Sequence, residues 1–331
     1  MTDRFTLDRR ALLAGAAITG AAATGAALGM GLPRQAAAAA PKQGLRRPTL
    51  YRFAVGDFEV TTILDGAIQL DGPHPIFGEN AAPEEVAALA QQNFLPPDRM
   101  EIAFTVTLVN TGSEVILFDS GNGAARRPDA GRLVELIGEA GIAPGEVDIV
   151  VLTHFHPDHI GGLMEEGSAA FPNASYVIPS AEYDFWTDES LLSDEAMKDR
   201  VALVQGNVVP LAEQARFIGG GDAVVSGIEA VNSHGHTPGH TSYHLESQGR
   251  RLLILGDVCN HYVVSLQRPD WHVRFDMDKE KAVAARREVL GMIAADRIPF
   301  VGYHMPPPAV GYLEAMGEGF RYVAASYQLN L

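Results

Sequence analysis

A cluster of potential metal ligands follows a short apolar run in the middle of the chain. Residues 148–152 read Asp-Ile-Val-Val-Leu, and the next seven read Thr-His-Phe-His-Pro-Asp-His. Four polar groups facing a core without partners would cost several kcal/mol, whereas imidazole and carboxylate are ligands that borderline divalent metals prefer. The pattern predicts a metal site at the end of a buried strand, and a solvated histidine-rich loop is the alternative. The candidate ligands are His154, His156, Asp158 and His159.

Three further candidate ligands follow later apolar segments. His236 lies in Ser-His-Gly-His-Thr-Pro-Gly-His, Asp257 ends the run Leu-Leu-Ile-Leu-Gly-Asp, and His304 ends Phe-Val-Gly-Tyr-His. Taken singly, an aspartate after a strand is more often a turn or cap residue, and a lone histidine is usually hydrogen-bonded at the surface. Because all three repeat the arrangement of the first cluster, we interpret them as ligands.

Together these motifs resemble the metallo-β-lactamase superfamily, in which they occur in the same order. The resemblance covers roughly residues 48–331. It implies an α/β fold, a four-layer αβ/βα sandwich with the metal site at one edge of the two sheets.

The resemblance also assigns roles to individual residues. One metal would be held by His154, His156 and His236, and a second by Asp158, His159 and His304, with Asp257 bridging both. Two more residues would hydrogen bond to the ligands or to nearby backbone and so support the site, namely Asp119 and His240.

Two bound metals limit the chemistry that such a site can perform. Metals roughly 3.5–4 Å apart can share a water and lower its pKa toward about 7, which yields a metal-bridging hydroxide. Asp158 and Asp257 are the candidate catalytic residues, and Asp158 could carry a proton to the leaving group. Zinc is the expected metal, and the same ligands also accept manganese, iron or cobalt.

Within the superfamily the chain resembles most the methyl-parathion-hydrolase-like group. Trp186, in Asp-Phe-Trp, matches one member of an aromatic cluster that lines the substrate pocket of that group, and the alternative is that Trp186 is an aromatic residue of the core. Residues 122–131 and 197–200 hold no aromatic side chain where two others are expected. We therefore expect hydrolysis of a lactone or aryl ester, with a phosphotriesterase as the alternative.

Two other functions fit the sequence less well. The zinc β-lactamases that use a cysteine at the second metal differ here, because Asp257 occupies that strand end and Cys259 lies off register. A non-catalytic metal-binding protein would be expected to lose ligands, and all seven are present. Redox members of the superfamily carry an added flavodoxin-like domain, which we do not expect here because no such domain follows Leu331.

The first 40 residues resemble a twin-arginine export signal. Arg9 and Arg10 precede a mildly apolar stretch, residues 11–32, and five alanines at 36–40 offer small residues to a signal peptidase. We expect residues 41–331 to form a single metallo-hydrolase domain that is periplasmic or secreted, while a non-cleaved membrane anchor is the alternative. Replacing both arginines with lysine should block export, which cell fractionation would measure; normal export of that variant would contradict this interpretation.

The remainder of the chain is strongly acidic. The whole chain carries a formal charge of −16, and its first 40 residues hold four basic and two acidic side chains, so the rest carries −18. This charge repels phosphate backbones, which weighs against nucleic-acid partners. We expect a small ester, lactone or phosphotriester as substrate and no stable membrane partner beyond export, and a homodimer is compatible with the sequence.

Residue patterns also locate the main elements of secondary structure. Alternating β-branched and aromatic residues indicate strands, and apolar residues at helical spacing indicate helices. The predicted strands cover 51–53, 57–63, 104–109, 115–118 and 148–152, and the predicted helices cover 131–140 and 278–295.

Overall fold

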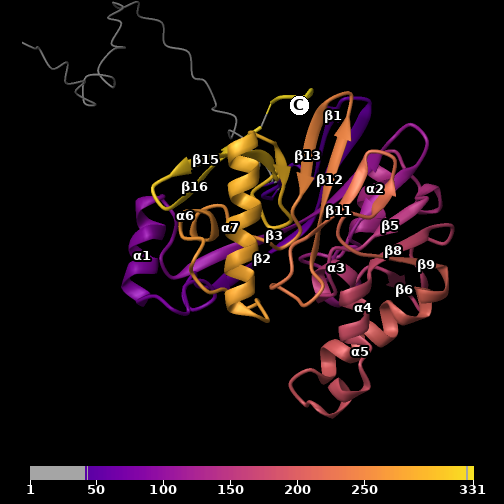
Figure 1. The fold of residues 1–331 in the computed structure, drawn as a ribbon, viewed down its shortest axis with the longest axis horizontal. Coiled ribbons are helices and arrows are strands. Elements are labelled where there is room, and N and C mark those ends of the chain that lie inside the picture. The colour runs from indigo at the N-terminus through magenta and orange to yellow at the C-terminus, as the bar shows by residue number, and fades with distance from the viewer. Residues whose placement is uncertain (1–41, 43, 326) are drawn as a thin grey trace, which may run out of the picture. The chain divides into compact units, whose positions relative to one another are not determined.

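The computed structural model describes residues 42, 44–325 and 327–331 (Figure 1). The chain divides into residues 1–46 and a compact unit from Arg47 to Leu331, and the fold below is that of the second unit. The predicted export signal, including Arg9 and Arg10, lies outside the described residues. Among the described helices, none is both long and apolar enough to cross a membrane.

Two seven-stranded sheets form the centre of this unit. The first has the order β1-β2-β3-β4-β5-β8-β9, with β1 Leu50–Val55, β2 Phe58–Asp71, β3 Arg99–Asn110, β4 Val115–Phe118, β5 Ile149–Val151, β8 Ser175–Pro179 and β9 Ala215–Ile218. The second runs from β10 to β16 in sequence order, with β10 Ala223–Val225, β11 Ile228–Asn232, β12 Thr241–Ser247, β13 Arg250–Ile254, β14 Phe300–Val301, β15 Val310–Met316 and β16 Gly319–Ala324. A short hairpin is separate from both, β6 Met164–Glu165 and β7 Ser168–Ala169.

Helices cover the outer faces of the two sheets (Figure 1). Apolar residues of α2, α4 and α5 pack with the first sheet, and those of α7 pack with the second. The helices are α1 Pro83–Gln92, α2 Leu133–Glu139, α3 Pro157–Ile160, α4 Ser180–Trp186, α5 Lys198–Asn207, α6 Val264–Gln267 and α7 Lys279–Asp296. The order helix, sheet, sheet, helix is the four-layer α/β sandwich that the sequence predicts.

The central strands are apolar on both faces because each face is buried. In β4, Ile116 and Phe118 belong to the core between the sheets, whereas Leu117 belongs to the core beneath the helices. Successive side chains of a strand point to opposite faces, so a strand buried on both sides reads as a continuous apolar run. Phe118 meets Tyr243 of β12 across the sandwich, with ring centroids 5.3 Å apart.

Most predicted elements are present, with shifted ends. The hairpin of β1 and β2 is confirmed, although β2 continues eight residues beyond the predicted end at residue 63, as far as Asp71. β4 matches its prediction, and β5, α2 and α7 lie within one or two residues of theirs. The predictions did not include the hairpin of β15 and β16, which pairs antiparallel at the edge of the second sheet.

Candidate metal centre

The first group of predicted ligands begins where β5 ends. β5 lies between β4 and β8, so the chain leaves the first sheet from an interior position. His156 keeps an extended conformation (φ −70°, ψ 154°), and Pro157 then begins α3. Proline is favoured at the first helical position because its φ is already helical and it needs no N–H there. This turn brings His159 back beside His154, with ring centroids 4.0 Å apart.

The other predicted ligands come from loops of the second sheet. His236 lies between β11 and β12, Asp257 follows β13, and His304 follows β14. The strands β11 to β14 are consecutive neighbours in the sheet, so their loops can meet at one edge. The seven predicted residues converge there in two groups. Within each group the ligand atoms lie within 4.8 Å of one another, and the groups are His154, His156, His236 and Asp257; and Asp158, His159 and His304.

Asp257 lies between the two groups. Its Oδ2 is 3.3 Å from His236 Nε2 and 3.0 Å from His304 Nε2, while its Oδ1 is 3.3 Å from His159 Nε2. The carboxylate is therefore close to one histidine of the first group and two of the second. A carboxylate that bridges two metals would have to lie in such a position, and the bridging role stays a prediction.

The buried nitrogen and oxygen atoms of the site fit divalent cations. His156 Nδ1 lies 3.1 Å from His154 Nε2 and 2.8 Å from His236 Nε2, so three imidazole nitrogens converge on a small space. Such lone pairs repel unless a proton or a cation lies between them. His159 Nε2 of the second group and Asp257 Oδ1 of the first are buried and have no hydrogen-bond partner among the described residues. Imidazole nitrogens with carboxylate oxygens suit zinc and similar ions.

Burial and neighbouring charges set the protonation of the site. Burial lowers the pKa of both His154 and His156, which favours the neutral form that a metal requires. Burial also opposes charge on His236, but Asp257 and Asp276 outweigh it and raise its pKa to about 9. Burial raises the pKa of the Cys259 thiol to about 12, so this cysteine stays protonated and lies outside both ligand groups.

The two predicted supporting residues both contact the ligand loops. Asp119 accepts hydrogen bonds from the backbone N–H and the hydroxyl of Thr153, each 2.8 Å long, and lies 2.7 Å from His159 Nδ1. His240 Nε2 accepts a 2.8 Å hydrogen bond from the backbone N–H of Asp257, and its Nδ1 lies 2.8 Å from the hydroxyl of Ser233. These contacts orient a ligand ring and the backbone of the shared carboxylate.

A buried glutamate, not identified from the sequence, joins two ligand loops. The carboxylate of Glu182, on α4, accepts hydrogen bonds from the backbone N–H groups of Phe155 and Gly239 and from the indole of Trp186. Phe155 lies between two predicted ligands, and Gly239 lies in the loop that carries His236. Glu182 thus ties the loop after β5 to the loop after β11.

A second buried chain of contacts, also missed, fixes His236. Asp276 Oδ1 lies 2.8 Å from His236 Nδ1, and Asp276 Oδ2 accepts a 2.7 Å hydrogen bond from Arg286. Arg286 is fully buried on α7 and also donates to the carbonyls of Val258, Pro269 and Trp271. The arginine therefore holds the carboxylate that sets the ring orientation of His236.

A cavity of about 280 Å³ opens onto the two ligand groups; we call it the metal-site cavity. Trp186 does not line it, contrary to the sequence prediction, because its ring is fully buried and bonded to Glu182. Aromatic walls come instead from Phe104 and Phe275. The lining residues are Ile68, Leu70, Ile102, Phe104, Arg126, His156, Pro157, Asp158, Arg200, Asp257, Asn260, Phe275 and His304.

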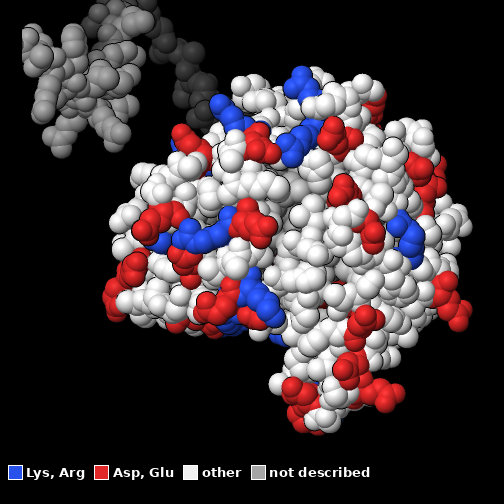
Figure 2. Space-filling view, in the orientation of Figure 1, with Lys and Arg blue, Asp and Glu red and all other residues white. Residues whose placement is uncertain are grey.

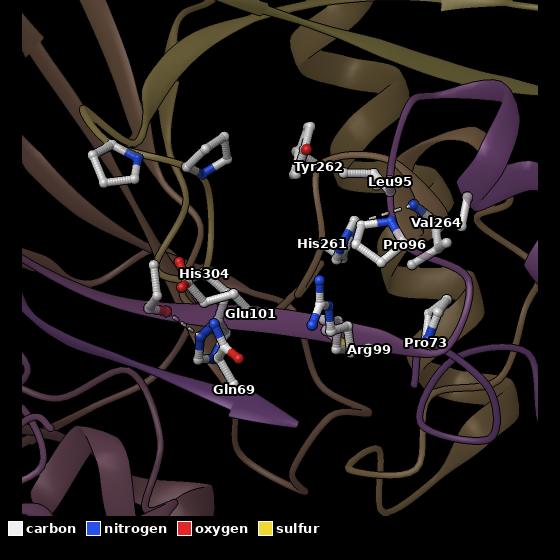
Figure 3. Close-up of a pocket in the computed structure, with 15 residues that line it drawn as sticks. Gln69, Pro73, Leu95, Pro96, Arg99, Glu101, His261, Tyr262, Val264 and His304 are labelled. Carbon is white, nitrogen blue, oxygen red and sulfur yellow. Dashed lines mark hydrogen bonds between the residues drawn. The ribbon is translucent and has the colours of Figure 1, made fainter. Parts of the chain in front are cut away.

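A second cavity, of about 260 Å³, is also lined by His304 (Figure 3). Figure 3 shows His304 and Glu101 on one side of it and His261 and Arg99 on the other. His304 lines both cavities. Among the described residues, the one hydrogen-bond partner of its Nδ1 is the carbonyl of Ala103, 2.8 Å away. Since a carbonyl accepts, Nδ1 carries the proton and Nε2 is free to face the site.

Two curated proteins are similar in sequence to part of this chain. An N-acyl homoserine lactonase of Bacillus cereus is 27% identical over 138 residues, which are 42% of this chain and 48% of that protein. Metallo-beta-lactamase domain-containing protein 1 of Mus musculus is 35% identical over 92 residues, 28% of this chain and 31% of that protein. The chain thus spans half or less of the length of these curated relatives.

Solved structures match over a larger part of the chain. The dizinc quorum-quenching lactonase AidC, in complex with a homoserine product, has a TM-score of 0.79 and 26% identity, covering 84% of this chain and 98% of AidC. The hydrolase AbOPH also has a TM-score of 0.79, with 25% identity, covering 86% of this chain and 100% of AbOPH. The family model of the metallo-beta-lactamase superfamily matches residues 105–299, more than half of the chain, and the chain belongs to this superfamily.

Proposed function

We propose that the protein is a dinuclear metal-dependent hydrolase that opens lactones or cleaves aryl esters. The observation that carries this proposal is the position of Asp257, within 3.3 Å of ligand nitrogens in both groups and at the wall of the metal-site cavity. The lactonase relatives support the substrate class, since AidC is described as a dizinc lactonase. Zinc is the metal we propose for this site.

The bound ions and the protein would divide the chemistry between them. Two divalent ions would supply a water of lowered pKa and would polarise the substrate carbonyl. Hydrolysis adds the water oxygen to the carbonyl carbon and breaks the ester C–O bond, so the leaving oxygen must gain a proton. Asp158 lines the cavity with 15% of its side chain exposed, and its Oδ2 could carry that proton. Asn260 donates a 2.8 Å hydrogen bond to Asp257 Oδ2 and steadies that carboxylate.

A phosphotriesterase of the methyl-parathion-hydrolase type is the less favoured candidate. The relatives described above include lactonases, and none of their descriptions names a phosphotriester. The absence of aromatic residues in 122–131 and 197–200 is a weaker argument than the sequence suggested, because Phe104 and Phe275 supply other aromatic walls. These two segments contribute two cationic side chains to the cavity wall, Arg126 and Arg200.

We expect the zinc-loaded enzyme to hydrolyse lactones or aryl esters with a kcat/KM at least about 10-fold above that for phosphotriesters, roughly 1.4 kcal/mol in transition-state terms. The test is a panel of lactones, aryl esters, phosphotriesters and β-lactams, each assayed with the same enzyme. Chelated enzyme, and the same sample after zinc is restored, provide the control. Faster turnover of methyl parathion than of every lactone and aryl ester would overturn the ranking.

A further inference from the structure

Two arginines line the metal-site cavity although the protein as a whole is acidic. Arg126 precedes α2 and is partly buried, and Arg200 lies on α5 and is exposed at the cavity mouth. Outside its first 40 residues the chain carries −18, and acidic side chains are spread over the face seen in Figure 2. Among the described residues, neither arginine forms an ion pair or a side-chain hydrogen bond, so both retain their donors for another group.

The guanidinium of Arg126 is held by an aromatic ring. Its Cζ lies 5.6 Å from the ring centroid of Phe104, and that ring packs edge-on against His304 with centroids 5.7 Å apart. Only one ring therefore separates the guanidinium from a predicted metal ligand. A guanidinium resting on an aromatic face keeps its N–H groups available in its own plane, where they can grip a carboxylate in a bidentate manner.

The next residue, Arg127, has a structural role that Arg126 lacks. Arg127 donates to the carbonyl of Gly131 and pairs with both carboxylate oxygens of Glu165 at 2.7 and 2.8 Å. Arg126, one residue earlier, has no such partner among the described residues and faces the cavity instead. The loop is therefore already anchored by Arg127, and Arg126 is not needed for that purpose.

The acidic residues of the cavity do not account for the two arginines. Among the described residues that line it, only Asp158 and Asp257 carry carboxylates, and both belong to the metal-ligand groups. Two divalent cations would outweigh these two negative charges, which leaves the arginines without a counter-charge from the protein. An anionic group on the substrate would supply it.

We propose that Arg126 and Arg200 bind a carboxylate carried by the substrate, so that the enzyme prefers small acidic esters or lactones. This proposal rests on the proposed hydrolase function and narrows its substrate class. The metal ligands and the arginines share one cavity, so the ester carbonyl would lie at the ligands while the distal carboxylate lies at the guanidinium groups. The volume of about 280 Å³ is at the lower end for ligand pockets, which limits the substrate to a short chain.

The first experiment compares two esters of similar size and leaving group, mono-para-nitrophenyl glutarate, which carries a carboxylate, and neutral para-nitrophenyl pentanoate. The zinc-loaded enzyme should favour the acidic ester in kcat/KM by about 10-fold or more. In the double variant R126Q/R200Q this ratio should fall to near one. The control variant R250Q removes an exposed arginine of β13 that does not line the cavity, and it should keep the wild-type ratio.

The second experiment measures binding without turnover. Titration calorimetry of the zinc-loaded protein with glutaramate, which carries one carboxylate, and with the neutral diamide glutaramide should show a preference for glutaramate that R126Q/R200Q loses. Equal affinity of wild type and double variant for glutaramate would overturn the proposal, because the carboxylate would then bind the metals alone. If the wild type binds glutaramate through the arginines yet cleaves neither ester, the hydrolase function fails and the anion site stands.

Discussion

Replacing Asp257 with alanine should lower kcat/KM for lactone hydrolysis by about 10³-fold or more, or roughly 4 kcal/mol. The change removes the one carboxylate that approaches nitrogens of both ligand groups, at 3.0 to 3.3 Å. It also leaves the side-chain amide of Asn260 without the carboxylate oxygen to which it donates. Kinetics on enzyme supplied with excess zinc, together with elemental analysis of the purified protein, would measure both effects.

Metal content gives this prediction a readout that does not depend on activity. The wild type should carry close to two divalent ions per chain, and D257A should carry one or none. The control is D296A, which removes an exposed carboxylate at the end of α7 that pairs with Arg251; its metal content and rate should match the wild type. A D257A protein that kept two ions and most of its activity would refute the shared role of this residue.

The candidate ligands could be predicted because each follows a short apolar strand and belongs to a compact motif. The apolar run before His154 indicates a buried strand, and three histidines and an aspartate follow it within seven residues. Strand-end positions are also fixed by the fold itself, since neighbouring strands in one sheet deliver their loops to one edge. The structure brings all seven residues together as the sequence predicts.

Glu182 supports the site through contacts that no local sequence pattern reveals. Glu182 lies in an ordinary amphipathic helix, and its partners Phe155 and Gly239 are 27 and 57 residues away. Trp186 was misassigned for the same reason, because the sequence shows an aromatic residue but not the side of α4 on which Glu182 and the core lie. Only the folded chain decides whether such a ring faces a cavity or the interior.

In helix α7 the spacing of apolar residues predicts most of the buried face but does not identify the buried arginine in it. In the sequence, Val283, Leu290 and Ile293 lie at near-helical spacing. The buried face of the helix comprises Ala282, Arg286, Val289, Leu290 and Ile293, and Val283 is only partly buried. Arg286 occupies a position four residues after Ala282 and three before Val289, the spacing of the buried stripe. A charged residue at that spacing was a signal for a buried ion pair.

Replacing Arg286 with methionine should therefore lower the free energy of unfolding by about 3–5 kcal/mol, since it leaves a buried carboxylate uncompensated. Apart from His236, Arg286 is the only ion-pair partner of Asp276 among the described residues. Arg286 also donates hydrogen bonds to three backbone carbonyls. The R286K variant should not recover the lost stability, because one ammonium group cannot donate at the same time to Asp276 and to the three carbonyls that the guanidinium contacts. Chemical denaturation of the zinc-loaded proteins would measure the change.

The adjacent residue provides a matched control on the same helix. Arg287 pairs with Asp270 at the surface, and their side chains are 43% and 55% exposed, respectively. R287M should therefore lower the free energy of unfolding by no more than about 1 kcal/mol. The double variant R286M/D276N should be less destabilised than the sum of the two single variants, because it removes the isolated charge that each partner would otherwise leave. If R286M cost no more than R287M, or if the double variant were simply additive, the buried pair would not be what holds Asp276 against His236. A weaker affinity for zinc in R286M would then need a cause other than the orientation of that histidine.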